Sequence, residues 1–555
     1  MNTWNPPSLR FLLVSMMLMT LVVLLPSRQS SLAQEDVRQP VVLQAVDDPL
    51  NATPSGEQVL RLAGSVEGIS TLDPALVRDL DTAFVTRQLY RGLTRLDEAL
   101  KPVPDLADRI DIDPSGLVYQ FTLRRDATFQ DGRRIVAEDV ASSFTRALDP
   151  ATAGGEASLL GGPTYLSDIA GAGDLLAGKA TGLSGVHVID DETVEITLAA
   201  PRATFLMKIA GVSALIVDRT QAASAKEWWR SPNGSGPFRV LDWIPDDHLT
   251  LGRVDDFYGG TPPLERVEIR LGSSAAQPFN LYQADQVDIA RVPEDAIDRI
   301  LDPESPYASE LTVSPMFSVS YIAFSTRVAP MDDPHIRRAV QLAFPRGKVA
   351  SVTLNGHVLR ASGLVPQGML GRQWPAGGET YDVDAAKQEI AESRYGSAER
   401  VPPLRIYGGS PSIAATLRDV LADDLGLRVE VVAVDWPEFL DGLALKRYPA
   451  YELYWGADYP DPETFLRSLF GSGSSDNYTG YENPRYDELL RQAAETLDPV
   501  ERGTNYDAAQ RVLLDDHVVL PMYYDVRYML QKPWVKNAAL TPLGMLSLDH
   551  VWLEH

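Results

Sequence analysis

The fold of this chain is decided by residues 451–470, which read YELYWGADYPDPETFLRSLF. The stretch is predicted to begin as a strand, because Tyr451, Leu453 and Trp455 occupy every second position and nearly all residue types at 451–455 favour a pleated surface. A helix is predicted to begin around Asp461-Pro462-Glu463, where Asp is a preferred N-cap and Pro suits the first helical position. Asp458 lies between the two, at the carboxyl end of a strand, where open α/β sheets bind ligands. It is a candidate partner for a cationic group, or else a helix-capping or salt-bridged loop residue.

The segment before this stretch predicts two more strand and helix units. We expect strands at residues 404–407 and 428–434 and helices at 412–425 and 436–446. The first helix ends at Gly426 and carries five apolar residues on one side: Ile413, Leu417, Val420, Leu421 and Leu425. With the strand at 451–455 this order is βαβαβ, which implies parallel strands with right-handed crossovers. Further helices are predicted at residues 334–344, 484–495 and 502–514.

The first half of the chain has a different pattern, rich in hairpins. Folded structure is expected from Val59 onward, with antiparallel strands at residues 118–123, 186–189 with 194–198, and 238–243 with 249–253. Helical composition occurs at residues 81–90, 137–148 and 279–284. This half is therefore predicted to be α+β.

The N-terminus has the pattern of a secretory signal peptide. Arg10 precedes an apolar run at residues 11–25, and Ser31 and Ala33 are the small residues expected before cleavage at Gln34. Because this run is shorter than the roughly 20 residues that span a bilayer, we expect residues 1–33 to be removed; the alternative is an uncleaved anchor. Residues 34–56 are polar and predict a flexible linker.

Length and composition exclude several classes of protein. A chain of 555 residues exceeds the length at which single cores stop growing, so two or more lobes are expected. The absence of cysteine excludes disulfides, thiolate metal sites, a cysteine nucleophile and a lipid-modified cysteine anchor. Without residues 1–33 the chain has 48 basic and 76 acidic residues, a net charge of −28. Nucleic acid is therefore an unfavourable partner.

Motifs for catalysis or metal binding were not found. The seven histidines lack the spacing of a metal site, and the sequence contains neither a Walker loop nor a G-x-S-x-G elbow. Gly408-Gly409-Ser410 lies between a strand and a helix, so it is either an anion-binding turn or a plain turn. We expect no enzyme activity, no metal and no cofactor.

Seven motifs spread over nearly 500 residues share one family resemblance. The chain resembles the extracytoplasmic solute-binding proteins of ABC importers in the oligopeptide/dipeptide-binding family, solute-binding protein family 5. The motifs, in family order, are TLDP at 71–74, LYRGL at 89–93, YQFTLRRDATFQDGRRIVAED at 119–139 with Arg146–Pro150, NGSGPF at 233–238, IRRAVQLAF at 336–344, WGADYPDPETF at 455–465 and YENPRYDELL at 481–490.

The resemblance implies an α/β fold of the periplasmic-binding-protein type II class, α+β in its larger lobe, with a hinged cleft between two lobes. The larger lobe would comprise residues 57–318 plus 524–555 and the smaller lobe residues 319–523. It also implies a monomer that closes over a peptide ligand and is recognised by ABC permease subunits and their ATPases, without a membrane span in the mature chain. The implied hinge residues are Phe317, Tyr321, Pro521 and Tyr524.

Carried onto this sequence, the resemblance assigns the ligand site to the stretch quoted first. Asp458 matches the aspartate that receives a peptide's α-ammonium group in oligopeptide-binding members, and Trp455 and Gly456 match its neighbours. We include the adjoining residues Tyr454, Ala457 and Tyr459 in the expected site.

The sequence departs from the family at the other end of the ligand. Well-known oligopeptide binders carry basic side chains for the peptide carboxylate at the positions of Leu443 and Glu452. Lys446 and Arg447 are close by in sequence, but side chains two or three positions further along a helix lie on a different face of it. The ligand is therefore a peptide of undefined length or another solute, namely a dipeptide, glutathione, haem, a nickel chelate or a sugar. A secreted hydrolase is a third alternative.

Overall fold

The computed structural model describes residues 41–44, 54–372, 374, 381–408 and 411–555. All of them belong to one unit of the chain, Pro40–His555. The predicted signal peptide, most of the predicted linker at residues 34–56, and Gly409 with Ser410 of the predicted turn lie outside the described residues.

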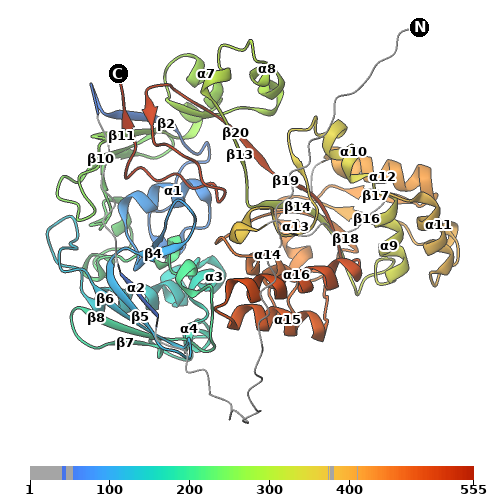
Figure 1. Cartoon of the computed structure of the whole chain (residues 1–555), viewed down its shortest axis with the longest axis horizontal. Coiled ribbons are helices and arrows are strands. Elements are labelled where there is room, and N and C mark those ends of the chain that lie inside the picture. Colours follow the sequence, from blue (N-terminus) through green and yellow to red (C-terminus); the bar gives the residue numbers. More distant parts are fainter. Residues whose placement is uncertain (1–40, 45–53, 373, 375–380, 409–410) are drawn as a thin grey trace, which may run out of the picture. The chain divides into compact units, whose positions relative to one another are not determined.

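One part of the chain, which we call the smaller lobe, is built on a six-stranded sheet with the order β15-β19-β14-β18-β16-β17. Strand β16 pairs in parallel with both β17 and β18 (Figure 1). This confirms the predicted parallel βαβαβ unit. Its elements are β16 (Leu404–Tyr407), α12 (Pro411–Leu425), β17 (Val429–Val432), α13 (Trp436–Ala444) and β18 (Ala450–Gly456).

Helix α12 packs as its periodicity predicts. Four of the five apolar residues named above are buried, whereas Val420 is half-buried. The helix ends at Gly426, whose φ of +68° lies in the left-handed region that glycine adopts without strain. The amide of Leu427 then donates to the carbonyl of Leu421 at 3.1 Å, which satisfies a free helix-end acceptor.

The remaining strands of this sheet come from segments far apart in sequence. Strand β14 (Ser318–Phe324) lies between β18 and β19 (Val519–Tyr524), antiparallel to both, and all seven of its residues are buried. Strand β15 (Leu359–Arg360) forms an edge. Besides α12 and α13, the smaller lobe contains α9 (Pro334–Ala343), α10 (Arg346–Lys348), α11 (Val383–Glu392), α14 (Glu463–Phe470), α15 (Pro484–Glu495) and α16 (Pro499–Asp515).

The other part of the chain, which we call the larger lobe, contains two main sheets. The seven-stranded sheet has the order β13-β20-β12-β2-β11-β10-β9 and the five-stranded sheet the order β1-β5-β6-β8-β7. Both predicted hairpins, β7 with β8 and β9 with β10, are confirmed as antiparallel pairs. The strands are β1 (Val41–Gln44), β2 (Val59–Ala63), β5 (Ala107–Ile112), β6 (Val118–Leu123), β7 (Val186–Val188), β8 (Thr193–Thr197), β9 (Phe238–Ile244), β10 (His248–Arg253), β11 (Arg266–Arg270), β12 (Ile289–Arg291), β13 (Leu311–Pro315) and β20 (Val526–Gln531).

Helices and two small ribbons complete the larger lobe. Helix α2 has the predicted bounds, and the predicted helices at 81–90 and 279–284 begin one residue early. The helices are α1 (Leu80–Leu89), α2 (Ala137–Leu148), α3 (Gly162–Leu166), α4 (Ala172–Leu176), α5 (Phe205–Lys208), α6 (Arg219–Ala222), α7 (Pro278–Gln283) and α8 (Ile297–Leu301), and the ribbons pair β3 (Thr94–Leu96) with β4 (Pro102–Pro104) and β21 (Val535–Lys536) with β22 (Trp552–Leu553).

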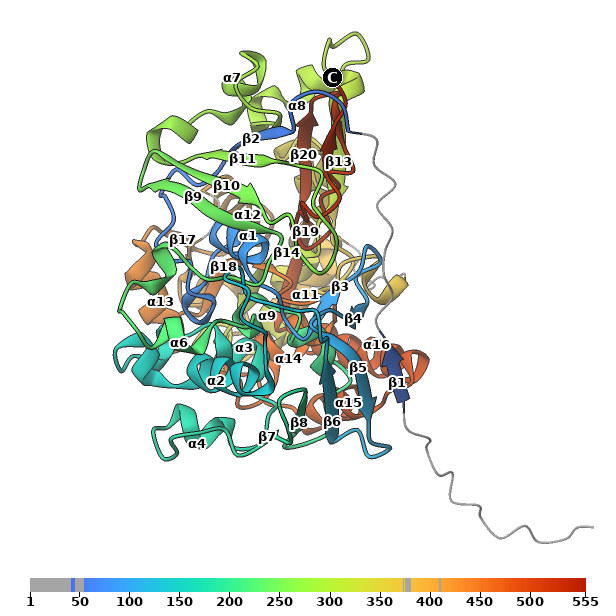
Figure 2. The same ribbon diagram turned by 90° about the vertical axis from the view of Figure 1, so that its left-hand side faces the viewer.

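Strand β1 corrects the predicted flexible linker in part. Residues 41–44 pair antiparallel with β5, from Val41 opposite Ile112 to Gln44 opposite Arg109. Figure 2 shows β1 beside β5 at the edge of the sheet. Polar composition with prolines suggested a tether throughout, but Val41-Val42-Leu43 can extend an open sheet edge, because such an edge offers unpaired backbone groups.

The chain passes between the sheets of the two lobes at two neighbouring points, from β13 to β14 and from β19 to β20 (Figure 1). The amide of Met316 donates to the carbonyl of Asp525 at 2.9 Å, which joins these crossings. Phe317 precedes β14 and Tyr524 ends β19, whereas Tyr321 and Pro521 lie opposite each other within the six-stranded sheet. The hinge role of these four residues and the exact lobe boundaries stay predictions.

A helix of the length and apolarity that crossing a bilayer requires does not occur among the described residues.

Candidate ligand-binding site around Asp458

The loop that carries Asp458 is fixed at both ends. Strand β18 ends at Gly456, and the amide of Ala457 donates to the carbonyl of Phe317 at 2.8 Å, beside the first crossing. At the other end, the buried carboxylate of Asp461 accepts the amide of Glu463 at 2.9 Å. Asp461 therefore caps the first turn of α14 in the predicted sense, although Pro462 occupies the N-cap position.

Asp461 is itself held by helix α16. The hydroxyl of Tyr506 donates to its Oδ1 at 2.9 Å, and the guanidinium of Arg502 forms an ion pair with its carboxylate. The loop is thus supported by α16 as well as by its own strand and helix.

The hydroxyl of Thr464 orients Asp458. It donates to Asp458 Oδ2 at 3.0 Å, and its oxygen accepts the Asp458 amide at 3.3 Å and Trp455 Nε1 at 3.4 Å. One donor and two acceptor sites are what a threonine hydroxyl provides. Thr464 is fully buried, so it joins the end of β18 to α14 at a fixed point.

The environment of Asp458 makes it a strong partner for a cation. Burial raises its pKa to about 6, nearby Asp476 adds to the increase, and the Thr464 hydrogen bond and the charge of Lys208 oppose it. At pH 7 the carboxylate is mostly ionised yet poorly hydrated. Such a group gains most from a charge-assisted hydrogen bond and is costly without one.

The other predicted site residues differ in their exposure to solvent. Tyr454 and Gly456 are exposed at the end of β18, and Trp455 and Ala457 are half-buried. Tyr459 is buried, and its ring centroid lies 5.1 Å from Nζ of Lys208 in the larger lobe. Asp458 and Trp455 are joined through Thr464, whereas Tyr459 contacts the opposite lobe. That each of these residues contacts a ligand stays a prediction.

Sequence reasoning missed Thr464, Lys208 and Asp476. Thr464 lies inside the quoted motif, at the second residue of α14, so a search for side chains able to reach Asp458 could have found it. Lys208 has no local signal, because it lies 250 residues away in the other lobe.

The two positions at which the family resemblance would imply basic side chains are occupied by other residues here. Leu443 is buried in α13 within the core of the smaller lobe, and Glu452 is buried in β18. Of the two nearby cations, Lys446 is half-buried and Arg447 exposed. Neither Leu443 nor Glu452 can neutralise a ligand's carboxylate.

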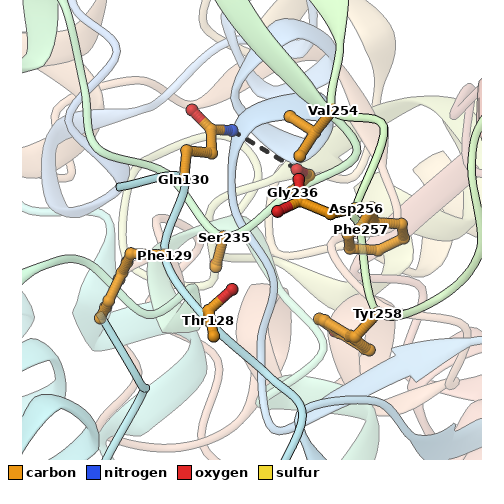
Figure 3. A pocket seen from close by; sticks show the side chains of 9 residues that line it. All are labelled: Thr128, Phe129, Gln130, Ser235, Gly236, Val254, Asp256, Phe257 and Tyr258. Carbon is orange, nitrogen blue, oxygen red and sulfur yellow. Dashed lines mark hydrogen bonds between the residues drawn. The ribbon is translucent and has the colours of Figure 1, made fainter. Parts of the chain in front are cut away.

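A small cavity in the larger lobe is not a solute site. Its volume is about 10 Å³, room for about one water molecule. Figure 3 shows Gln130 pointing to Gly236, whose carbonyl accepts its Nε2 at 3.4 Å. The lining residues are Thr128, Phe129, Gln130, Ser235, Gly236, Val254, Asp256, Phe257 and Tyr258.

The NGSGPF motif beside this cavity has a packing role. A Cβ on Gly234 would lie 2.0 Å from the carbonyl oxygen of Leu89, and a Cβ on Gly236 would lie 2.4 Å from that of Gln88. Both glycines therefore allow this loop to contact the end of α1, which is a structural reason for the motif.

One group of described residues approaches the geometry of a metal site, at the surface of the smaller lobe. Candidate ligand atoms of His335, Glu389 and Glu392 lie within 4.8 Å of one another. The guanidinium of Arg338 already lies 2.9 Å from Glu389 Oε1, so this carboxylate has a cationic partner. The group is explained as an ion-pair cluster between α9 and α11.

Comparison with solved structures gives the fold. The structure matches the murein tripeptide binding protein MppA of Escherichia coli with a TM-score of 0.74, at 24% identity, over 91% of this chain and 100% of that chain. This likeness confirms the predicted two-lobed fold of the periplasmic-binding-protein type II class.

Comparison of sequences gives the family. The chain is 27% identical over 510 residues to the periplasmic oligopeptide-binding protein OppA of Escherichia coli strain K12, covering 89% of this chain and 92% of the relative. It is 28% identical over 513 residues to the probable deoxycholate-binding periplasmic protein YgiS of the same strain, covering 89% and 93%. The model of the bacterial extracellular solute-binding proteins, family 5 (middle region), matches residues 101–477. The chain belongs to this family.

Proposed function

We propose that this protein is the extracytoplasmic substrate-binding component of an ABC importer, and that it captures peptides between its lobes and delivers them to a permease. The observation that carries the proposal is the environment of the Asp458 carboxylate. Its carboxylate is oriented by Thr464, half-buried, and influenced electrostatically by groups of both lobes, namely Lys208 of the larger lobe and Asp476 of the smaller. The relative named for oligopeptide binding supports the choice of ligand.

In this proposal Asp458 binds the α-ammonium group of the peptide. An ammonium ion placed beside a poorly hydrated carboxylate forms a charge-assisted hydrogen bond, and lobe closure strengthens the bond by excluding water. The peptide main chain would pair with exposed backbone near Gly456, as in strand addition, while its side chains enter roomy, hydrated pockets. This arrangement gives broad specificity.

A second candidate keeps the fold and changes the solute. Leu443 and Glu452 provide no cation for a C-terminal carboxylate, and one relative is named for deoxycholate rather than for peptides. A solute with an amine and no free carboxylate, or a non-peptide solute, would suit these side chains better than a tripeptide held at both ends.

The first experiment identifies the solute that the protein carries. Purified protein is denatured, and the released small molecules are identified by mass spectrometry. Peptides with free amino termini support the proposal. A single non-peptide solute favours the second candidate, and peptide cleavage during incubation with pure protein would revive the alternative of a secreted hydrolase.

The second experiment tests the anchor with trialanine and its N-acetylated form. Asp458→Asn should weaken trialanine binding by about 2–5 kcal/mol, as for truncation of one side of a buried charge pair. The same variant should leave the already weak binding of N-acetyl-trialanine unchanged, which makes the acetylated peptide a matched control. Equal trialanine affinity of the variant and the unmodified protein would exclude Asp458 as the anchor.

The proposal includes a mature chain that begins at Gln34 and is free of a lipid anchor, since the sequence has no cysteine. N-terminal sequencing of the secreted protein checks the cleavage site. A retained run at residues 11–25 would instead mean a membrane tether.

A further inference from the structure

The two lobes meet at a second place, away from the crossings. The segment leading into α5 of the larger lobe contacts the start of α14 in the smaller lobe. The hydroxyl of Thr204 donates to Oε2 of Glu463 at 2.6 Å, and Nζ of Lys208 lies 3.5 Å from the same oxygen. Nearby, the amide of Ala203 donates to the carbonyl of Ala494 in α15 at 2.9 Å.

The charges at this contact are arranged around one ammonium group. Nζ of Lys208 lies 2.8 Å from Oδ2 of Asp168, in the larger lobe, as well as 3.5 Å from Glu463 in the smaller lobe. The side chains of Lys208 and Glu463 are only 9% and 3% exposed. Arg202 also pairs with Asp168 at 3.0 Å, and Arg467 lies 3.5 Å from Glu463.

Lys208 is the only one of these cations that touches carboxylates of both lobes. Arg202 contacts the carboxylate of its own lobe, and Arg467 contacts the carboxylate of its own helix. Without the Lys208 ammonium, Asp168 would keep only Arg202 and Glu463 only Arg467, so none of these cations would join the two carboxylates across the contact. Breaking a buried ion pair on one side is strongly destabilising, because it leaves uncompensated charge.

This contact lies next to the loop that carries Asp458. Glu463 is the first residue of α14, five residues after Asp458, and the ring of Tyr459 packs against the Lys208 ammonium. If α5 withdraws from α14, Tyr459 loses its partner and the larger-lobe side of the Asp458 site moves away. Lobe separation at this point would therefore open the site to water.

We propose that Lys208 is a positioning residue of the binding site: by bridging Asp168 and Glu463 it holds the larger lobe against the Asp458 loop and so slows the release of a bound solute. The statement about release rests on the proposed function. The statement about the bridge does not, because it concerns a contact within the protein.

The bridge is tested first without any ligand. The chain has no cysteine, so a double variant with Ala203→Cys and Ala494→Cys carries a single reporter pair. Mild oxidation should give a disulfide in this background, and adding Lys208→Gln should slow disulfide formation about tenfold or more, since the lobes then separate more often. Equal rates with and without Lys208→Gln, or failure of the pair to cross-link in either background, would overturn the bridge.

Solute release is tested by stopped-flow tryptophan fluorescence with trialanine. Lys208→Gln should raise the dissociation rate about tenfold or more and change the association rate little, as for a truncated buried charge pair. Lys208→Arg keeps the charge and should restore most of the slow release, and Lys179→Gln, at an exposed lysine of the same lobe, is the matched control. An unchanged dissociation rate in Lys208→Gln would overturn the positioning role.

A variant with a smaller change guards against loss of folding. Thr204→Val removes only the 2.6 Å hydrogen bond to Glu463 and should speed both release and lobe separation by a smaller factor.

The proposed bridge and the proposed ammonium anchor can fail independently of each other. If Asp458→Asn binds trialanine normally while Lys208→Gln still slows cross-linking, the ammonium anchor is wrong and the bridge stands. If Lys208→Gln leaves the rate of disulfide formation unchanged while Asp458→Asn weakens trialanine binding, the bridge is wrong and the anchor stands.

Discussion

The hydroxyl of Thr464 donates to Oδ2 of Asp458 at 3.0 Å, from a position that is fully buried. This one bond links the loop after β18 to the first turn of α14. It also stabilises the ionised form of Asp458, because a hydrogen bond donated to a carboxylate favours its charge. The strength of the proposed cation site therefore depends on a neutral side chain as well as on the aspartate.

The pKa of Asp458 predicts how ligand binding depends on pH. With a pKa of about 6, Asp458 is mostly ionised at pH 7 and mostly protonated at pH 5, whereas a peptide amino group with a pKa near 8 stays charged throughout. Trialanine affinity should therefore fall about tenfold from pH 7 to pH 5. Isothermal titration calorimetry at intervals across this range measures the change.

The control for this pH effect is Asp458→Asn, which carries no titrating group at this position. Its residual affinity should be almost flat between pH 5 and pH 7. A parallel loss of affinity in the variant and the unmodified protein would assign the pH dependence to another group.

Replacing Thr464 should shift this pH dependence. Thr464→Val keeps the side-chain shape and removes the hydroxyl that lowers the pKa of Asp458. The pKa should therefore rise, and the midpoint of the binding curve should move to higher pH. Thr504→Val, at an exposed threonine of α16, is the control and should leave the midpoint in place. A midpoint that moves to lower pH would contradict the role given to the Thr464 hydroxyl.

Local patterns in the sequence predicted several elements of the smaller lobe. The apolar spacing of Ile413, Leu417 and Leu421 predicted α12, and the alternation at residues 451–455 predicted β18, because each pattern is the repeat of one element. The position of Asp458 after β18 followed from the strand and helix signals within residues 451–470. Periodicity did not reveal β1, since four residues that extend an open edge have no repeat to detect.

Contacts between distant segments could not be predicted in this way. Asp168, Lys208 and Glu463 are brought together by the packing of two lobes, and none of them is marked by its neighbours in sequence. A buried glutamate at a helix start suggests only a favourable interaction with the helix terminus. Its actual partners become apparent only once α5 and α14 are placed side by side.

The burial of α12 predicts unequal effects of two similar substitutions. Leu417 is completely buried in the core beneath this helix, whereas Val420 is only half-buried. Leu417→Ala should lower the free energy of unfolding by about 2–5 kcal/mol, through lost transfer free energy and the cavity left behind. Val420→Ala should cost distinctly less. Urea unfolding followed by circular dichroism compares them, and equal losses would mean that the helix faces the sheet in another orientation.

His517 predicts a loss of stability in mild acid. It follows α16, its φ is +54°, and its Nδ1 lies 2.8 Å from Oε1 of Gln341. Burial, together with the nearby charges of Arg338 and Arg337, lowers its pKa to about 4 from an ordinary value of 6.5. The unfolded chain therefore binds a proton at this histidine more readily than the folded protein does. The stabilising contribution of neutral His517 is present above pH 6.5 and is lost as the pH falls toward 4.

Replacing this histidine should remove that part of the acid sensitivity. His517→Asn suits the left-handed backbone and can still donate a hydrogen bond to Gln341. Between pH 7 and pH 5 the free energy of unfolding of the unmodified protein should fall by about 1–2 kcal/mol more than that of the variant, as measured by urea unfolding. His187→Asn, at an exposed histidine of β7, should keep the full pH dependence. If His517→Asn and His187→Asn lose stability in parallel, His517 is not the group that makes the fold sensitive to acid.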